Sequence, residues 1–243
     1  MGTITMVASG KDGVGKSTTC VFLADALAAL DKRVLVLELD SGLRSLDIIS
    51  GTHGNTVYDI LDVLNGRCEP EKAIIKAPSP RSNVYVLSAP YRQEALQGAK
   101  FVALCNTLGE QYDHVLIDTA SLNGTTLAAS AVAMNALLVA TADPVSIRDS
   151  RIINDKLLDL SVPNVRLIIN RLVPSRVEAG IVPSLDYVID NVGAKLIGLI
   201  PESSEIALSA ASGQPLVKKT LEAEIFHRIA MRMHGKDLPL AMQ

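Results

Sequence analysis

The chain has 243 residues, of which 48% are hydrophobic and 3% aromatic, and its formal net charge is −3. This composition excludes a disordered chain, because the apolar residues can fill a sizeable core of Ala, Val, Ile and Leu. Lys and Arg are scattered along the chain without a basic run, so the charge pattern gives no support for a nucleic-acid partner.

Short apolar runs alternate with longer stretches of helical periodicity. The predicted strands cover 3–9, 33–39, 83–89, 114–119, 135–141, 165–170 and 195–200, and the predicted helices cover 16–31, 56–65, 93–110, 124–133, 145–160, 184–192 and 221–234. The strands are almost uniformly hydrophobic, as parallel strands covered on both faces are. This alternation predicts an α/β fold with a doubly wound, mainly parallel sheet flanked by helices. No linker or repeat divides the chain, so we expect a single domain over residues 1–243.

The first predicted strand runs directly into SGKDGVGKSTT, residues 9–19. Gly10 to Ser17 match G-x-x-x-x-G-K-[ST], which after a strand and at the start of a helix is typical of a phosphate-binding loop. Glycines let the backbone point its N–H groups at phosphate oxygens, Lys16 can reach the β- and γ-phosphates, and the Ser17 hydroxyl can ligate Mg²⁺. The predicted nucleotide-binding residues of the loop are Gly10, Lys11, Asp12, Gly13, Val14, Gly15, Lys16, Ser17 and Thr18.

The loop contains a second lysine, Lys11, and is similar to KGGVGK[ST]T, the deviant Walker A motif of the MinD/ParA family of dimeric ATPases. The resemblance continues, in the family's order and spacing, in ELDSGLRSLDIISG (38–51), TADPVSIRDSRI (141–152), IINRLVPSRVEAG (168–180) and GLIPESSEIALSAASGQPLV (198–217). It favours the MinD branch over the plasmid-partition and flagellar-number branches. It implies a P-loop ATPase that binds ATP or ADP with Mg²⁺, forms a homodimer with ATP, and reaches the partner's nucleotide through Lys11.

Two carboxylates follow predicted strands. The resemblance implies that Asp40 orients or activates the attacking water, a task of positioning, although a cap at a strand end would also explain this residue. Asp118 ends the apolar strand VLID, as a Walker B aspartate does, and is expected to hold Mg²⁺ together with Ser17.

Two segments depart from the family pattern. Glu38 stands where aspartate is common, and residues 119–122 lack the usual proline and glycine, which puts the motion of this second switch segment in question.

Three further residues are candidates for contacting the base. Asn170 and Arg171 follow the strand VRLII, where an amide can pair with an adenine edge and a guanidinium can stack on the ring. Pro201 lies in the segment that resembles the one closing over the adenine in the family, and it is expected to cover the other face. A polar turn after a strand is the alternative for Asn170 and Arg171.

Asp12 places a carboxylate in a loop that is expected to bind an anion, at a position where the family has glycine. Three arrangements are open. Asp12 can pair with Lys11 and weaken its contact across the dimer, point outward and repel its counterpart in the partner, or be met by another cation. We expect ATP to bind, and dimerisation or hydrolysis to be slower than is usual in the family.

The predicted helix over 221–234 has an apolar stripe. It is expected to pack on the sheet rather than to lie on a membrane, because its polar face mixes Glu with Arg. The chain continues without the Lys- and Phe-rich tail of the MinD branch, so we expect any membrane contact to be indirect. By resemblance, Arg148, Asp149 and Arg151 border the dimer interface and contact regulatory proteins, although a solvated helix face would explain them equally well.

Cys20, Cys68 and Cys105 form no CxxC pair, which argues against a disulfide framework or a metal cluster. No signal peptide and no run of roughly 20 apolar residues is recognisable, so a cytoplasmic protein is expected, with peripheral association at the inner face of the membrane left open.

The resemblance implies a slow ATP-driven dimerisation switch that regulates the placement of the division septum. The main alternative is a weakly hydrolysing or non-hydrolysing scaffold of the CpaE/TadZ type, which Asp12 favours. An iron–sulfur cluster carrier of the same fold and a DNA-carried partition ATPase are the remaining alternatives.

Overall fold

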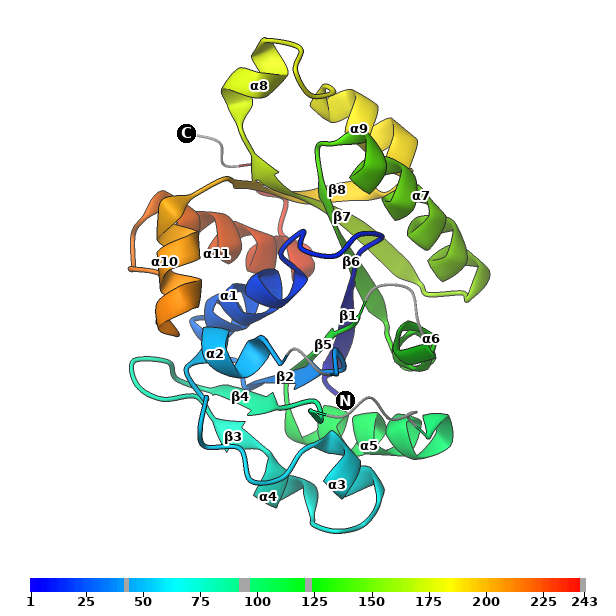
Figure 1. Ribbon diagram of the computed structural model, residues 1–243, viewed down its shortest axis with the longest axis vertical. Coiled ribbons are helices and arrows are strands. Elements are labelled where there is room, and N and C mark those ends of the chain that lie inside the picture. The colour runs from blue at the N-terminus through cyan, green and yellow to red at the C-terminus, as the bar shows by residue number, and fades with distance from the viewer. Residues whose placement is uncertain (42–43, 92–96, 121–123, 241–243) are drawn as a thin grey trace.

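The computed structural model describes residues 1–41, 44–91, 97–120 and 124–240 (Figure 1). Within these residues one eight-stranded sheet has the order β3-β4-β2-β5-β1-β6-β7-β8, and only the β3–β4 pair is antiparallel. The strands are β1 (Thr3–Ala8), β2 (Val34–Glu38), β3 (Ile75–Lys76), β4 (Val84–Leu87), β5 (His114–Asp118), β6 (Asn135–Thr141), β7 (Asn164–Leu172) and β8 (Lys195–Pro201).

Helices cover both faces of the sheet. They are α1 (Lys16–Ala28), α2 (Leu46–Ser50), α3 (Ile60–Leu64), α4 (Pro70–Ala73), α5 (Gly98–Gln111), α6 (Gly124–Ser130), α7 (Pro144–Asp159), α8 (Pro174–Glu178), α9 (Leu185–Val192), α10 (Ser204–Ser212) and α11 (Leu221–Met233). The apolar side chains of α1, α2 and α11 pack in one core, and those of α3, α5, α7 and α9 pack in a second core on the other face. The predicted doubly wound, mainly parallel α/β fold is confirmed.

The differences from the sequence prediction concern short elements. The helices α2, α4, α8 and α10 and the edge strand β3 were not predicted, and α3 begins at Ile60 rather than at 56. Asp59 explains this start, because its side chain accepts hydrogen bonds from the N–H groups of Leu61 and Asp62 and thereby caps the helix. Residues 93–96 of the helix predicted over 93–110 lie outside the described residues.

The C-terminal helix α11 packs against α1 and β8, as expected. Its Ile225, Phe226, Ile229 and Ala230 are buried, and the rings of Phe226 and Phe22 meet edge to face with their centroids 5.7 Å apart. The apolar stripe is therefore used in the core. None of the helices in the described ranges is long and apolar enough to cross a membrane.

The position of β1 decides where a ligand can bind. This strand pairs in parallel with β5 on one side and β6 on the other. The strands β2 to β5 are added on one side of β1 and the strands β6 to β8 on the other, so the order of the strands reverses at β1. In open parallel sheets, the crevice for ligands lies at such a point, outside the carboxyl ends of the strands. The loop between β1 and α1, the end of β2 at Glu38 and the end of β5 at Asp118 all lie at this edge.

Truncating the side chain that joins α11 to α1 should destabilise the fold. We expect Phe226→Ala to lower the free energy of unfolding by about 3–5 kcal/mol, because the change removes a fully buried ring and leaves a cavity. Urea unfolding followed by circular dichroism measures the change. Leu208→Ala is the control, since Leu208 is 71% exposed and its loss should cost less than about 0.5 kcal/mol. Equal losses in the two variants would contradict the packing described for α11.

Candidate nucleotide-binding site

The loop from Ser9 to Gly15 has a backbone shape that glycine makes accessible. Gly13 and Gly15 have φ angles of 75° and 95°, in the left-handed region that side chains disfavour. Gly15 is also the N-cap residue of α1, and no side chain caps this helix. The first N–H groups of α1 are therefore left for an anion, and Ser17 and Thr18 lie half-buried in the same turn.

Two glycines of the loop lie against other elements without room for a side chain. A Cβ atom on Gly10 would lie 2.3 Å from the backbone carbonyl carbon of Asp149 in α7. A Cβ on Gly15 would lie 2.4 Å from the Nδ2 atom of Asn170 at the end of β7. The loop is thus held between α7 and β7. This packing explains both glycines independently of the phosphate-binding motif.

Lys16 is a buried cation, with 6% of its side chain exposed. Its Nζ donates a hydrogen bond of 3.0 Å to the Ser9 hydroxyl, whose own hydrogen is donated to the Lys11 carbonyl. The carboxylate of Asp12 lies 3.7 Å from Nζ and is 81% exposed. Of the three arrangements expected for Asp12, the structure shows the one in which another cation meets it, and this cation is the lysine predicted to bind phosphate.

Lys11 forms its ion pair elsewhere. Its Nζ lies 3.3 Å from Oδ1 of Asp143, the N-cap residue of α7, and the two side chains are 44% and 35% exposed. Asp143 also accepts hydrogen bonds from the Thr141 hydroxyl and the Ser146 N–H. Burial alone would raise the pKa of Asp143, but these hydrogen bonds and Lys11 outweigh it and hold the pKa below its usual value. Pairing of Lys11 with Asp12 is therefore not the arrangement found among the described residues.

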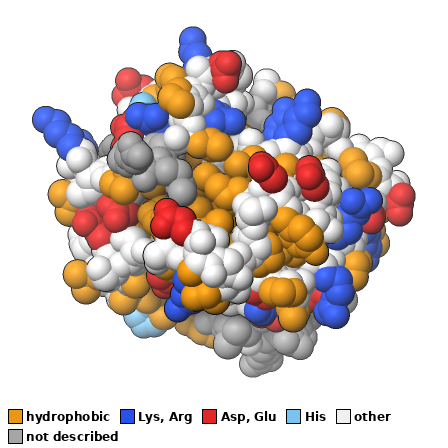
Figure 2. Space-filling view, turned by 90° about the horizontal axis from the view of Figure 1, so that it is seen from above, with side chains coloured by type: hydrophobic (Ala, Val, Ile, Leu, Met, Phe, Trp, Pro, Cys, Tyr) orange, Lys and Arg blue, Asp and Glu red, His pale blue; other side chains and the backbone are white. Residues whose placement is uncertain are grey.

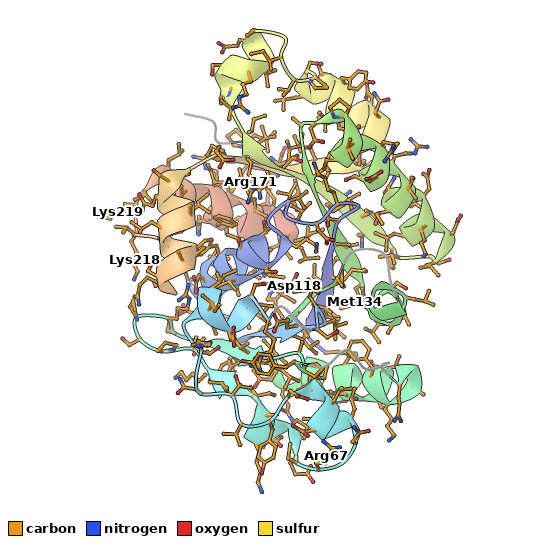
Figure 3. The ribbon with its side chains drawn as sticks, viewed as in Figure 1. Arg67, Asp118, Met134, Arg171, Lys218 and Lys219 are labelled. Carbon is orange, nitrogen blue, oxygen red and sulfur yellow. The ribbon has the colours of Figure 1, made fainter. Side chains whose placement is uncertain are left out.

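Asp118 is a fully buried carboxylate at the end of β5, near the centre of the molecule (Figure 3). Neither of its oxygens has a hydrogen-bond partner among the described residues. The net pKa of Asp118 is raised to about 7. Burial is the largest cause of this rise, the Ser17 hydroxyl and Lys16 oppose it, and Asp40 adds to it. An orphaned buried carboxylate beside a hydroxyl is a donor set that suits Mg²⁺, which takes oxygen ligands. The residues present therefore fit the predicted cation, and Ser17 and Asp118 stay its predicted ligands.

Asp40 is half-buried and lies two residues beyond β2. Burial raises its pKa, Lys16 lowers it and Asp12 raises it, so its carboxyl group lies within electrostatic reach of both side chains. The structure thus brings Asp40 to the same site as Lys16, Asp118 and Asp12. Gly42 and Leu43 of the same segment, and Ser121 and Leu122 after β5, lie outside the described residues.

The residues predicted to contact the base lie at the ends of β7 and β8. Asn170 is buried and uses its amide on the protein: Nδ2 donates to the Val14 carbonyl at 2.7 Å, and Oδ1 accepts from the Arg171 N–H. Arg171 is exposed, and Pro201 is half-buried beside Leu172. These bonds leave the amide one hydrogen to donate and one lone pair on Oδ1 to accept. A contact of Asn170 with adenine stays a prediction.

A cavity of about 410 Å³ lies beside the phosphate loop and, of the three residues predicted to contact the base, reaches Arg171. Its lining comes from the loop, the end of β6 with the N-cap of α7, the end of β7, α8 and the segment after β8. The charged residues of this lining are Lys11, Asp12, Asp143, Arg171, Arg176 and Glu202. Figure 3 shows Arg171 above Asp118 at this end of the sheet. Of the predicted loop residues, Lys11, Asp12, Gly13 and Val14 therefore line this cavity together with Arg171.

The comparisons with known proteins agree with this geometry. Residues 5–216 match the model of the CobQ/CobB/MinD/ParA nucleotide binding domain. The chain belongs to this family. Among relatives, the septum site-determining protein MinD of Synechocystis is 33% identical, with 98% of this chain and 92% of that protein covered.

Two solved structures place the chain beside MinD proteins within the family. MinD in the MinC:MinD complex of Aquifex aeolicus superposes with a TM-score of 0.91 at 31% identity, covering 98% of both chains. MinD of Pyrococcus horikoshii, solved with Mg-ADP, gives a TM-score of 0.84 at 25% identity and covers 96% of both chains. The resemblance found in the sequence is confirmed over nearly the whole chain.

The face of α7 that is predicted to contact regulatory proteins carries ion pairs and exposed apolar side chains. On α7, Arg148 pairs with Asp149 at 2.7 Å and Arg151 with Asp155 at 2.9 Å, while Val145 and Ile152 are exposed. Figure 2 shows the neighbouring end of the molecule, which carries α8 and α9, with hydrophobic side chains in its middle and acidic side chains among them. Ile181 and Tyr187 in this region are 71% and 53% exposed.

Among the described residues, four that form hydrogen bonds at the site were not predicted from the sequence. Ser9 and Asp143 hold the two lysines, Glu38 accepts backbone N–H groups, and Thr119 donates its hydroxyl hydrogen to the Val7 carbonyl of β1. The Asp143-Pro144 pair is a signal for the start of a helix and could have identified Asp143 as a cap. No local signal connects it with Lys11, which is 132 residues away.

A methyl group added at Gly10 should test whether nucleotide binding depends on the close packing of the loop against α7. We expect Gly10→Ala to lower the free energy of unfolding by about 1–3 kcal/mol and to weaken ADP binding, because the new Cβ meets rigid backbone of α7. Calorimetric titration with Mg-ADP and urea unfolding measure the two effects. Gly98→Ala is the control, since its Cβ would enter open space. Unchanged ADP affinity in Gly10→Ala would show that the loop does not need this contact.

Proposed function

We propose that this chain is an ATP-dependent dimerisation switch of the MinD type that acts in placing the division septum. The observation that carries the proposal is the phosphate loop, in which the buried Lys16 faces the anion site and Lys11 stays partly exposed at its rim. The similar proteins named above are septum site-determining MinD proteins, which supports the cellular role.

In this proposal, hydrolysis depends on residues that position the phosphates and the attacking water and that neutralise negative charge on the phosphates. The N–H groups at the start of α1 and the Lys16 ammonium hold the phosphates, and Asp40 orients the attacking water. Ser17 and Asp118 would hold Mg²⁺, which when bound neutralises charge on the phosphate oxygens. Asn170, Arg171 and Pro201 are proposed to contact the base. ATP hydrolysis is slow in this scheme, because Asp12 shares Lys16 with the phosphate.

The dimer is proposed to form when Lys11 leaves Asp143 and reaches the nucleotide of the partner. One similar structure is a complex of MinD with MinC, so we propose that a regulatory protein binds the α7 face around Arg148, Asp149 and Arg151. A cytoplasmic location fits this role, with membrane contact made through a partner protein.

The decisive experiment is the molar mass in solution, measured by light scattering with ADP and then with ATP and Mg²⁺, followed by phosphate release on the same samples. We expect the mass to double from the 25.8 kDa of the single chain only with ATP, and phosphate release to be slow. Lys11→Ala should abolish the doubling while ADP still binds, and Lys156→Ala, on the exposed side of α7, should leave it intact. An ATP-independent mass in the unmodified protein would contradict the switch.

A second candidate is a nucleotide-gated scaffold with little or no hydrolysis. The contact between Asp12 and Lys16 favours it, because a carboxylate near the ammonium competes with the phosphate that must bind there. ATP-dependent dimers without phosphate release would support this second candidate.

Removing the charge of Asp12 should strengthen nucleotide binding. We expect Asp12→Asn to tighten ATP binding by about three- to tenfold, since a nearby exposed charge changes binding by about 1 kcal/mol, and the gain should shrink at high salt. Titration calorimetry at two salt concentrations measures the effect. Asp159→Asn, an exposed change at the end of α7, is the control. ATP affinity that is equal in Asp12→Asn and the unmodified protein would show that this carboxylate does not compete with phosphate.

A further inference from the structure

The helix α2 contains only the five residues from Leu46 to Ser50 and follows the loop that carries Asp40. A helix this short is unstable by itself, because nucleation costs more than its few hydrogen bonds return. Its position therefore depends on what holds its two ends. Both ends are held by buried, ionisable side chains from other elements.

Glu38, the last residue of β2, holds the N-terminal end. Its Oε1 accepts a hydrogen bond of 3.0 Å from the N–H of Leu46, the first residue of α2. Its Oε2 accepts one of 3.3 Å from the N–H of Ala89, just after β4. Glu38 is fully buried, so the two bonds satisfy both carboxyl oxygens where no water reaches them.

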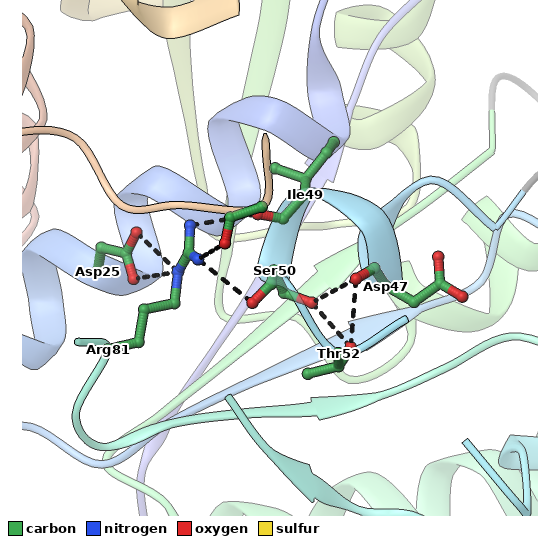
Figure 4. Close-up of polar contacts among 7 residues, drawn as sticks. Asp25, Asp47, Ile49, Ser50, Thr52 and Arg81 are labelled. Atoms are coloured by element: carbon green, nitrogen blue, oxygen red, sulfur yellow. Dashed lines mark hydrogen bonds and ion pairs between the residues drawn. The ribbon is translucent and has the colours of Figure 1, made fainter. Parts of the chain in front are cut away.

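Arg81 holds the C-terminal end, as Figure 4 shows. Its Nε donates to both carboxylate oxygens of Asp25 in α1, at 2.9 and 3.1 Å. The two terminal nitrogens donate to the last carbonyl groups of α2, with 3.2 Å to Ile49 and 3.2 Å to Ser50. One of them also donates to the carbonyl of Gly213 after α10. A guanidinium can make all these contacts at once because its donors form a rigid fork.

The backbones that Arg81 joins lie in direct contact. Gly51 and Gly213 have φ angles of 75° and 67°, and a Cβ on Gly51 would lie 2.8 Å from the Gly213 carbonyl oxygen. The helix α10 begins three residues after Pro201, which is proposed to cover the base. Arg81 therefore joins α1, the helix after the Asp40 loop and the helix after the base-covering segment.

We propose that Arg81 is a positioning residue for ATP hydrolysis, which rests on the proposed function above. Arg81 anchors α2 at one end, and Glu38 anchors it at the other. Glu38 joins the start of α2 to the end of β2, two residues before Asp40, so the place of the water-orienting carboxylate beside Lys16 depends on the position of α2. Nucleotide binding depends on the phosphate loop, which Arg81 does not contact. Loss of the fork should therefore slow turnover without weakening the binding of ADP.

The test uses the full chain with Arg81→Lys, which keeps the charge beside Asp25 but cannot span the same carbonyl groups. We expect kcat to fall by about tenfold or more, because catalysis is sensitive to small displacements of positioned groups. The affinity for ADP should stay within about twofold. Hydrogen exchange should become faster in the peptide covering 44–50 and stay unchanged in α1. Arg67→Met is the matched control, since Arg67 is 68% exposed, pairs with Asp62 and lies far from the site (Figure 3).

If Arg81→Lys does not fold, Asp25→Asn combined with Arg81→Met removes both members of the buried pair and gives the same comparison. An unchanged kcat would overturn the proposal, and so would equal losses of kcat, ADP affinity and protection throughout the chain, which indicate a purely structural role. If the unmodified protein released no phosphate, the proposed hydrolysis would fail instead. Exchange in the 44–50 peptide would then still decide whether Arg81 holds α2, and unchanged exchange there would overturn that contact.

Discussion

The site depends on two buried ionisable groups, the Lys16 ammonium and the Asp118 carboxyl group, whose polar atoms the protein satisfies only in part. Lys16 has a hydroxyl and a more distant carboxylate as neighbours, and Asp118 has no hydrogen-bond partner among the described residues. Burying a charge without full compensation is costly, so such groups are retained where a ligand satisfies them. The parallel sheet offsets this cost, because the backbone hydrogen bonds of β1, β2 and β5 and the two apolar cores hold these strands together at the carboxyl edge. A bound phosphate with its cation would supply the missing partners of Lys16 and Asp118.

The amino-acid sequence is sufficient to predict the parts of this site that lie at the ends of long, apolar strands. The runs that form β1, β5 and β7 are continuous in hydrophobicity, so the sequence alone places Lys16, Asp118 and Asn170 at one edge of the sheet. The loop motif and the spacing of the following segments suffice to recognise the family. In these places local pattern and global fold agree, which is why prediction works there.

The parts that could not be predicted depend on contacts between distant segments. Arg81 lies in a Pro- and Ser-containing stretch, and its partners are 31, 32, 56 and 132 residues away along the chain. The helices α2 and α10 are short, and tertiary contacts rather than periodicity determine where they begin and end. In the sequence, Glu38 is only a mild departure from the family pattern. In the structure its carboxyl group reaches two backbone N–H groups on different elements.

Asp143 makes two kinds of contact, one that caps α7 and one that pairs with Lys11. Its hydrogen bonds to Ser146 and Thr141 are part of the start of α7, whereas its contact with Lys11 is a partly exposed ion pair. Pairs of this kind contribute about 0–1 kcal/mol. Lys11 can therefore depart without unravelling the helix, and it can return just as readily. In the proposed cycle, Lys11 would therefore leave Asp143 and return to it at almost no energetic cost, so the ion pair of the single chain would not oppose reversibility.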